Sequence, residues 1–209
     1  MTPLRPSQPR RDFLARLATL GASLGMVAPH TVAASNAPGT AGDDPWVSRL
    51  RGTHRVVFHS HMPTEGLALR WAQTFLDTQT SAYGVAEHAM SVLVGLNGRS
   101  VGWFFNDAMW AKYPTIGEVM GAPGSRNPQS GAIAALAARN VILLACANSI
   151  RASGQRFLPE PARNEASTRT AFADDVRANL IAGVEVVPAM IVTLQQAQDR
   201  GCRYIYAGG

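Results

Sequence analysis

The sequence predicts an α/β domain, a three-layer sandwich in which helices cover both faces of a mostly parallel five-stranded sheet. Five short runs rich in β-branched and aromatic residues alternate with stretches that have helical spacing of apolar side chains, which is typical of parallel sheets. One run, residues 140–145, is apolar almost throughout, as in strands buried on both faces. Hydrophobic residues make up 46% of the 209 residues, enough for a folded core in a single domain.

Each predicted strand is a short apolar run with a clear boundary. Asn97-Gly98 closes the second strand and Pro188 stops the fourth, because both are turn or strand-breaking signals. The last strand precedes the C-terminus. In chain order, the predicted strands are residues 55–59, 88–96, 140–145, 184–187 and 203–206.

Between these strands, apolar residues three and four positions apart predict helices. Ser130 is a candidate N-cap, and Gly201 occupies the C′ position after the last helix. Residues 113–129 contain several prolines and glycines, which predicts a long loop with a functional or oligomeric role. We interpret Trp103, Phe104, Trp110 and Tyr113 as core or subunit interface. The predicted helices are residues 64–78, 101–113, 130–139, a helix that begins near 148, 171–180 and 191–200.

The N-terminal segment has the features of an export signal. Arg10-Arg11 is followed by Phe13-Leu14, a weakly apolar stretch and small residues that end at Ala34. Residues 1–34 therefore resemble a twin-arginine (Tat) signal peptide cleaved near Ala34, which places the mature protein in the periplasm. Residues 35–53 are predicted to form a linker and N-terminal extension, and 54–209 the α/β domain. Membrane contact is expected only during export.

Charge and cysteine content exclude several classes of protein. Residues 1–34 carry four arginines against one aspartate, so most of the formal net charge of +5 lies in the segment that is predicted to be removed. A nucleic-acid-binding protein would instead concentrate basic residues in its folded part. Two cysteines exclude a disulfide scaffold and a zinc site made of cysteines alone. We expect no nucleic-acid partner and no cofactor.

The first candidate functional residue is Cys146, which follows the predicted strand 140–145. Ligands bind beyond the carboxyl ends of the strands in an open parallel sheet. A helix that starts at Asn148 or Ser149 would present its positive end to the thiol, and Arg151 would add a cation within one turn. Both lower the pKa of a cysteine. The alternative is a buried, inert cysteine that packs as a small hydrophobe.

The second candidate is His59-Ser60-His61-Met62, where the first strand ends. His59 and His61 point to the same side of a strand and could share a metal with Met62 and Cys146, a soft ligand set that suits copper. Two histidines without an obvious third ligand are also compatible with one hydrogen-bonded and one solvent-exposed side chain.

Four segments together resemble the DsrE/DsrF-like family, which has the YchN-like fold. They are Ala145-Cys-Ala-Asn-Ser-Ile-Arg151, Gly183-Val-Glu-Val-Val-Pro-Ala189, Leu194-Gln-Gln-Ala-Gln-Asp-Arg-Gly201 and Tyr204-Ile-Tyr206. The opening Val56-Val-Phe-His59 is also similar to the first strand of the family. The resemblance covers about residues 54–207, and the stretch from Asp107 to Pro128 looks like a feature of an exported subgroup.

The resemblance implies a trimer or hexamer and matches Cys146 to the cysteine that carries sulfane sulfur in the sulfur-relay members. The chain would then be a sulfur carrier or a sulfurtransferase-like protein with a persulfide on Cys146, and a donor or acceptor protein is a possible partner. Asn148, Arg151 and His59 would support the anion or exchange a proton. The alternative is a non-enzymatic, oligomeric protein that binds a small ligand or copper in the periplasm.

The predicted topology also distinguishes the two cysteines. Cys146 follows one strand and Cys202 precedes another, so in a parallel sheet they lie at opposite ends, roughly 17 Å apart. A disulfide needs Cα atoms within about 7 Å. We therefore expect no internal disulfide, a reactive Cys146 and an inert Cys202.

Overall fold

The computed structural model describes residues 44–208, and the predicted signal peptide and the first part of the predicted linker and extension, residues 35–43, lie outside this range. Five strands form one sheet in the order β4-β3-β2-β1-β5, and all neighbouring strands are parallel. The prediction of a single α/β domain with a parallel five-stranded sheet is confirmed. The strands are β1 His54–Ser60, β2 Met90–Leu96, β3 Ile142–Cys146, β4 Val184–Val187 and β5 Arg203–Tyr206.

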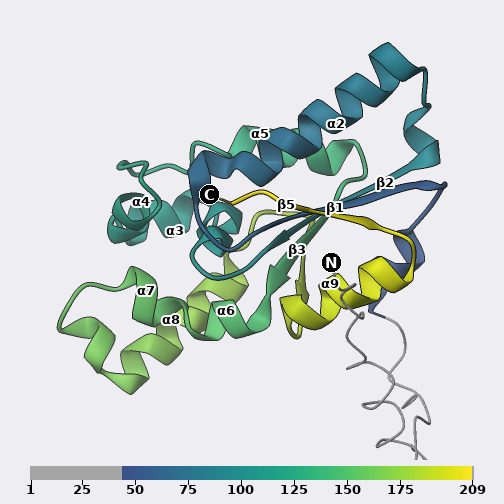
Figure 1. Ribbon diagram of the computed structural model, residues 1–209. Helices are drawn as coiled ribbons and strands as arrows, with labels where there is room; N and C mark the ends of the chain where they lie inside the picture. Colours follow the sequence, from purple (N-terminus) through teal and green to yellow (C-terminus); the bar gives the residue numbers. More distant parts are fainter. Residues whose placement is uncertain (1–43, 209) are drawn as a thin grey trace, which may run out of the picture. The chain divides into compact units, whose positions relative to one another are not determined.

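Helices cover both faces of the sheet (Figure 1). The long helix α2, Leu67–Tyr83, and the alanine-rich α5, Ser130–Ala138, lie on one face, and α9, Met190–Asp199, lies on the other. Three further helices, α6, Ala147–Arg151, α7, Ser153–Phe157, and α8, Ala166–Ala178, pack against one another after β3. No helix in the described part of the chain is long and apolar enough to cross a membrane.

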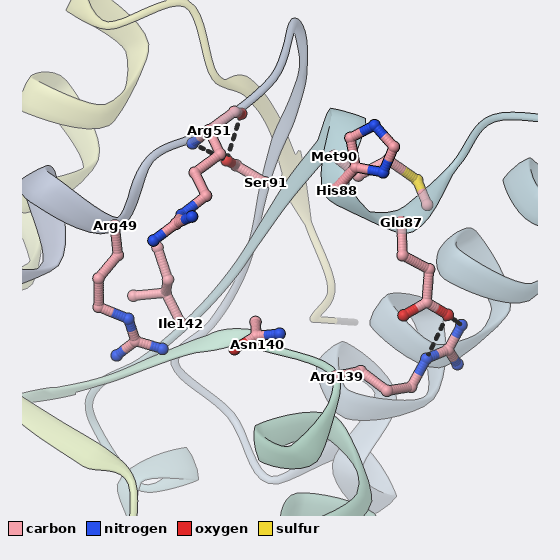
Figure 2. A pocket seen from close by; sticks show the side chains of 9 residues that line it. All are labelled: Arg49, Arg51, Glu87, His88, Met90, Ser91, Arg139, Asn140 and Ile142. Carbon is pink, nitrogen blue, oxygen red and sulfur yellow. Dashed lines mark hydrogen bonds and ion pairs between the residues drawn. The ribbon is translucent and has the colours of Figure 1, made fainter.

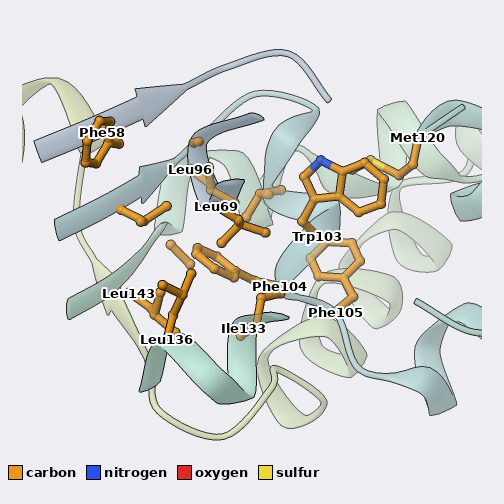
Figure 3. Close-up of a cluster of buried hydrophobic side chains, with 14 of the residues drawn as sticks. Phe58, Leu69, Leu96, Trp103, Phe104, Phe105, Met120, Ile133, Leu136 and Leu143 are labelled. Atoms are coloured by element: carbon orange, nitrogen blue, oxygen red, sulfur yellow. The ribbon is translucent and has the colours of Figure 1, made fainter. Parts of the chain in front are cut away.

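The larger hydrophobic core lies on the face covered by α2 and α5 (Figure 3). Trp103 and Trp110 are fully buried in it, and their rings stack with centroids 5.8 Å apart. Phe104 is also buried, whereas Tyr113 packs at the edge. These tryptophans therefore belong to the core and supply no exposed surface for a subunit interface.

The smaller core lies between the sheet and α9. Trp46, in the short 3-10 helix η1, Pro45–Arg49, is completely buried there. The residues just before β1, which the sequence assigned to an extension, therefore pack against the sheet as part of the same core. Strand residues with alternating side chains separate the two cores, as the pleat requires.

Two predicted segments have a different local structure. The predicted helix 101–113 is interrupted: the 3-10 helix η4 covers Ser100–Phe104, and α3 begins anew at Asp107 and ends at Lys112. Asn106 caps α3, because its side chain accepts a hydrogen bond from the Met109 amide at 3.0 Å. The predicted loop 113–129 contains a short helix, α4, Thr115–Val119, which starts directly after a proline, a residue that suits the first turn of a helix.

The structure also corrects several helix starts. Gln129, not Ser130, is the N-cap of α5, and the Ser130 hydroxyl instead donates to Asp107 at 3.0 Å. Helix α8 begins five residues earlier than predicted. The last helix agrees with prediction to within one residue, and Gly201 follows it with a φ of 83°, as expected for a C′ glycine. The remaining short elements are the 3-10 helices η2 Thr64–Gly66, η3 Glu87–Ala89 and η5 Ala162–Asn164.

Candidate functional site

Cys146 is the last residue of β3, between β2 and β4. It is also the N-cap of α6, so this helix starts two residues earlier than the Asn148 or Ser149 cap predicted from the sequence. Its side chain faces α9 and packs with Leu144, Val187 and Met190. Only 4% of Cys146 is exposed, so the thiol is buried.

Hydrogen-bond donors surround the sulfur. The Met190 amide donates to Sγ at 3.4 Å from the first turn of α9. Burial raises the pKa of Cys146, but hydrogen bonds from the Met190 amide, the Ser149 hydroxyl and amide, and the Asn148 amide outweigh it, and the net pKa lies below the ordinary value. Donors of this kind stabilise a thiolate more than a thiol.

Arg151, which was predicted to stabilise the thiolate as a cation, has a different partner. Its guanidinium donates a hydrogen bond to Oδ1 of Asn148, on the exposed side of α6. The groups that lower the pKa of Cys146 are neutral hydroxyl and amide donors. Several nearby dipoles, rather than the predicted charge of Arg151, therefore lower the pKa of Cys146. Such dipoles act effectively in a site that contains little water.

Ser149 is a functional candidate that the sequence analysis considered only as a helix cap. Ser149 is buried, and its Oγ accepts a hydrogen bond from the Gly98 amide at 2.8 Å. Its hydroxyl in turn donates to the sulfur of Cys146. The serine thereby connects the loop after β2 to the thiol. Its position three residues after Cys146 is the signal that could have identified it, because the third residue of a helix faces the N-cap side chain.

Gly98 can occupy this position only because it has no side chain. Its φ is +57°, and a Cβ there would lie 2.5 Å from the carbonyl oxygen of His61. The amide of Gly98 can therefore reach Ser149 only because the backbone turns tightly past the end of β1. The Asn97-Gly98 pair, predicted as a strand terminator, is also part of the site.

His59 lies on the same face of the sheet as Cys146, two strands away and separated from it by β2. It is 8% exposed. Oδ1 of Asn97 lies 3.0 Å from Nε2, and the Tyr204 hydroxyl lies 3.0 Å from Nδ1. Because Oδ1 only accepts, Nε2 carries the hydrogen and Nδ1 accepts from Tyr204. Desolvation lowers the pKa of His59, which favours this neutral form.

His59 therefore reaches the cysteine only indirectly, through Asn97, Gly98 and Ser149. It does not contact the thiol, so the predicted direct proton exchange has no support in this geometry. The imidazole instead fixes the side chain of Asn97 at the end of β2. His59 and Cys146 thus lie on the same face of the sheet, but they do not contact each other.

The two histidines do not form a common metal site. His61 has its own partner, Tyr206, whose hydroxyl lies 2.7 Å from Nδ1 and whose ring stacks on the imidazole. Both nitrogens of His59 are engaged in hydrogen bonds. Met62 accepts from the Arg99 guanidinium at 3.8 Å. Within residues 44–208, no cluster of three or more His, Cys, Asp or Glu side chains could hold a metal ion.

Cys202 occupies the opposite end of the sheet, just before β5. It is 5% exposed, almost as buried as Cys146, and both cysteines are free. Burial raises its pKa, and the nearby Arg55 offsets only part of this effect. The two thiols thus have pKa shifts of opposite sign, and the expected difference in reactivity has a structural basis.

No family model and no curated protein matches the chain. Among solved structures, the comparison finds a match to the protein of unknown function MTH1491 from Methanobacterium thermoautotrophicum. The two share 20% sequence identity, the match covers 73% of this chain and 98% of the other, and the TM-score is 0.46.

Proposed function

We propose that the protein is an exported, DsrE/DsrF-like sulfur carrier that holds sulfane sulfur as a persulfide on Cys146. The observation that carries this proposal is the position of Cys146 at the end of β3 and the start of α6, where the Met190 amide donates a hydrogen bond to Sγ at 3.4 Å; the lowered pKa of Cys146 and the raised pKa of Cys202 agree with it. The thiolate is the nucleophile in sulfur transfer. The sequence motifs around Cys146 agree with this role.

The proposed step is a thiolate displacement. Sγ of Cys146 attacks a terminal sulfur of an inorganic polysulfide, the new S–S bond forms as the neighbouring S–S bond of the donor breaks, and the shortened polysulfide leaves with the bonding electron pair. The product is a persulfide anion on Cys146. The negative charge would accept hydrogen bonds in both the thiolate and the persulfide anion, from the amides of Met190 and Asn148 and from the Ser149 hydroxyl.

The burial of Cys146 restricts the donor. With an exposed fraction of 4%, the thiol suits a small inorganic donor better than a cysteine persulfide on another protein. Ile191, the first α9 residue after Met190, is 79% exposed, so the turn that carries the Met190 donor lies at the surface.

Mass spectrometry tests the proposal. The mature protein is treated with polysulfide, desalted, alkylated and mapped by peptide. We expect the mass of one sulfur atom on the Cys146 peptide, which is removed by dithiothreitol. Cys202→Ser should still be loaded, and Cys146→Ser should not, although its circular dichroism spectrum is unchanged. The absence of sulfur from Cys146, or equal loading of both cysteines, would refute the proposal.

A further inference from the structure

A cavity lies at the end of the sheet where the strands begin, opposite the end that carries Cys146. It has a volume of about 430 Å³ and is lined by residues from the segment before β1, the start of β2 and the start of β3 (Figure 2). This volume is within the range of small-molecule sites. Cys146 ends β3 at the carboxyl edge, so the cavity is separate from the thiol site.

The charged groups that line this cavity are mostly positive: three arginines and one glutamate. Arg49 pairs with Glu185, which does not line the cavity. Arg139 pairs with Glu87 and, on its other side, with Asp77 at 2.6 Å.

Arg51 differs from these two arginines. Its side chain is exposed, its guanidinium has no hydrogen-bond or ion-pair partner in the described part of the chain, and Figure 2 shows it on the same side of the cavity as Arg49 and Ile142. An unpaired guanidinium with five N–H donors suits a bidentate oxyanion.

The backbone of Arg51 is held firmly in place. The buried hydroxyl of Ser91 accepts from the Arg51 amide and donates to the Arg51 carbonyl, both at 2.6 Å. Gly52 follows with a φ of +57°, and a Cβ there would lie 2.0 Å from the carbonyl oxygen of Ala89. This close approach requires glycine and fixes the loop against the start of β2. The arginine side chain therefore projects from a constrained point, which reduces the entropy lost on binding.

The other residues that line the cavity indicate which further groups a ligand could carry. Both hydrogen bonds that Arg139 donates to Glu87 go to Oε1, which leaves Oε2 to accept from a hydroxyl or ammonium group. The amide of Asn140 offers a further polar contact, and Met90 and Ile142, which belong to the cores on opposite faces of the sheet, contribute apolar atoms at the two sides of the cavity. The cavity is larger than an inorganic anion needs.

We infer that this cavity binds a small organic anion, a carboxylate or phosphate ester with hydroxyl groups, through the guanidinium of Arg51. The anionic group pairs with Arg51. The inference does not depend on sulfur chemistry at Cys146, because the two sites share no residue and lie at opposite ends of the strands.

NMR titration of the ¹⁵N-labelled mature protein tests the inference at constant ionic strength. Glycerol 3-phosphate and glycerate serve as probes that differ in the anionic group, and glycerol is the neutral control. We expect saturable shifts of the Arg51, Ser91 and Asn140 amides with at least one anion and none with glycerol. The stronger probe identifies the anionic group.

Two variants test the role of the charge. Arg51→Gln keeps both backbone bonds to Ser91, so it should fold normally, as its melting temperature will show, and bind the anion at least about tenfold more weakly. Arg70→Gln removes an exposed arginine of α2 and should bind as the unchanged protein does. Absence of saturable shifts with either anion, shifts of equal size with glycerol, or unchanged affinity in Arg51→Gln would overturn the inference.

Discussion

Replacement of Ser149 by alanine should raise the pKa of Cys146. The change removes the hydroxyl that donates to Sγ and leaves the three backbone amides of Met190, Asn148 and residue 149 in place. A hydrogen bond to a charged group is worth about 1.5–3 kcal/mol, and one pKa unit corresponds to about 1.36 kcal/mol. Because the other donors compensate in part, we expect a rise near the lower end, about one unit.

The rate of alkylation by iodoacetamide as a function of pH measures this shift. A pKa higher by one unit lowers the thiolate fraction below the pKa by about tenfold, but a more basic thiolate is also more nucleophilic, with a Brønsted coefficient of about 0.4–0.5. The rate at neutral pH should therefore fall only about threefold. The midpoint of the alkylation rate plotted against pH is therefore a more sensitive measure of the pKa than the rate at neutral pH.

Ser153→Ala is the matched control. Ser153 is another buried serine close in sequence, and its hydroxyl donates only to the carbonyl of Ile150. Its loss should leave the pH profile unchanged. Ser149→Ala also deprives the Gly98 amide of its acceptor, which costs about 1–3 kcal/mol, so unfolding is measured in parallel. An unmoved midpoint in Ser149→Ala, or equal shifts in both variants, would show that the hydroxyl does not stabilise the thiolate.

Three further predictions follow from particular contacts. Asn127→Ala should lower the free energy of unfolding by about 2–3 kcal/mol in urea denaturation, because its buried side-chain amide donates to two backbone carbonyls that would lose their partner; a loss below the experimental error would contradict this. The folded state should lose stability as the pH falls below about 6.5, since the pKa of His59 is lowered on folding and the unfolded chain takes up the proton first; His59→Gln should weaken this pH dependence, and an identical dependence in both proteins would count against it. Arg10→Lys combined with Arg11→Lys should leave the precursor in the cytoplasm on cell fractionation, and normal periplasmic recovery would exclude twin-arginine export.

The strands could be predicted from sequence because their signal is local. All five predicted strands occur, and the apolar run that became β3 is buried on both faces, as its composition indicated. Helix boundaries were less predictable, since several residues compete for the same cap. Asn148 and Ser149 are usual N-caps, but the chain placed the cysteine itself in that position.

Contacts across the sheet could not be predicted from one sequence. The partners of His59 are Asn97, which directly follows β2, and Tyr204, which lies within β5, and the pairing depends on strand order and register. The cavity around Arg51 likewise joins three segments distant in the sequence. Residue type indicated which side chains could do chemistry, whereas topology decided which of them meet.

The two cysteines show how the direction of a parallel sheet controls chemistry. Both are small, free and almost equally buried, so burial alone would raise the pKa of each. Cys146 ends a strand and precedes helix α6, whose first amides are unpaired and donate toward the sulfur. Cys202 follows the end of α9, and its own amide donates to the carbonyl of Ala197; burial raises the pKa of its thiol and no hydrogen-bond donor among the described residues lowers it again. Every parallel strand is preceded by a helix C-terminus and followed by a helix N-terminus when helices connect the strands. The same residue type is therefore stabilised as a thiolate at one edge and as a thiol at the other, and moving the cysteine from position 146 to the start of a strand would reverse its pKa shift without any change in burial.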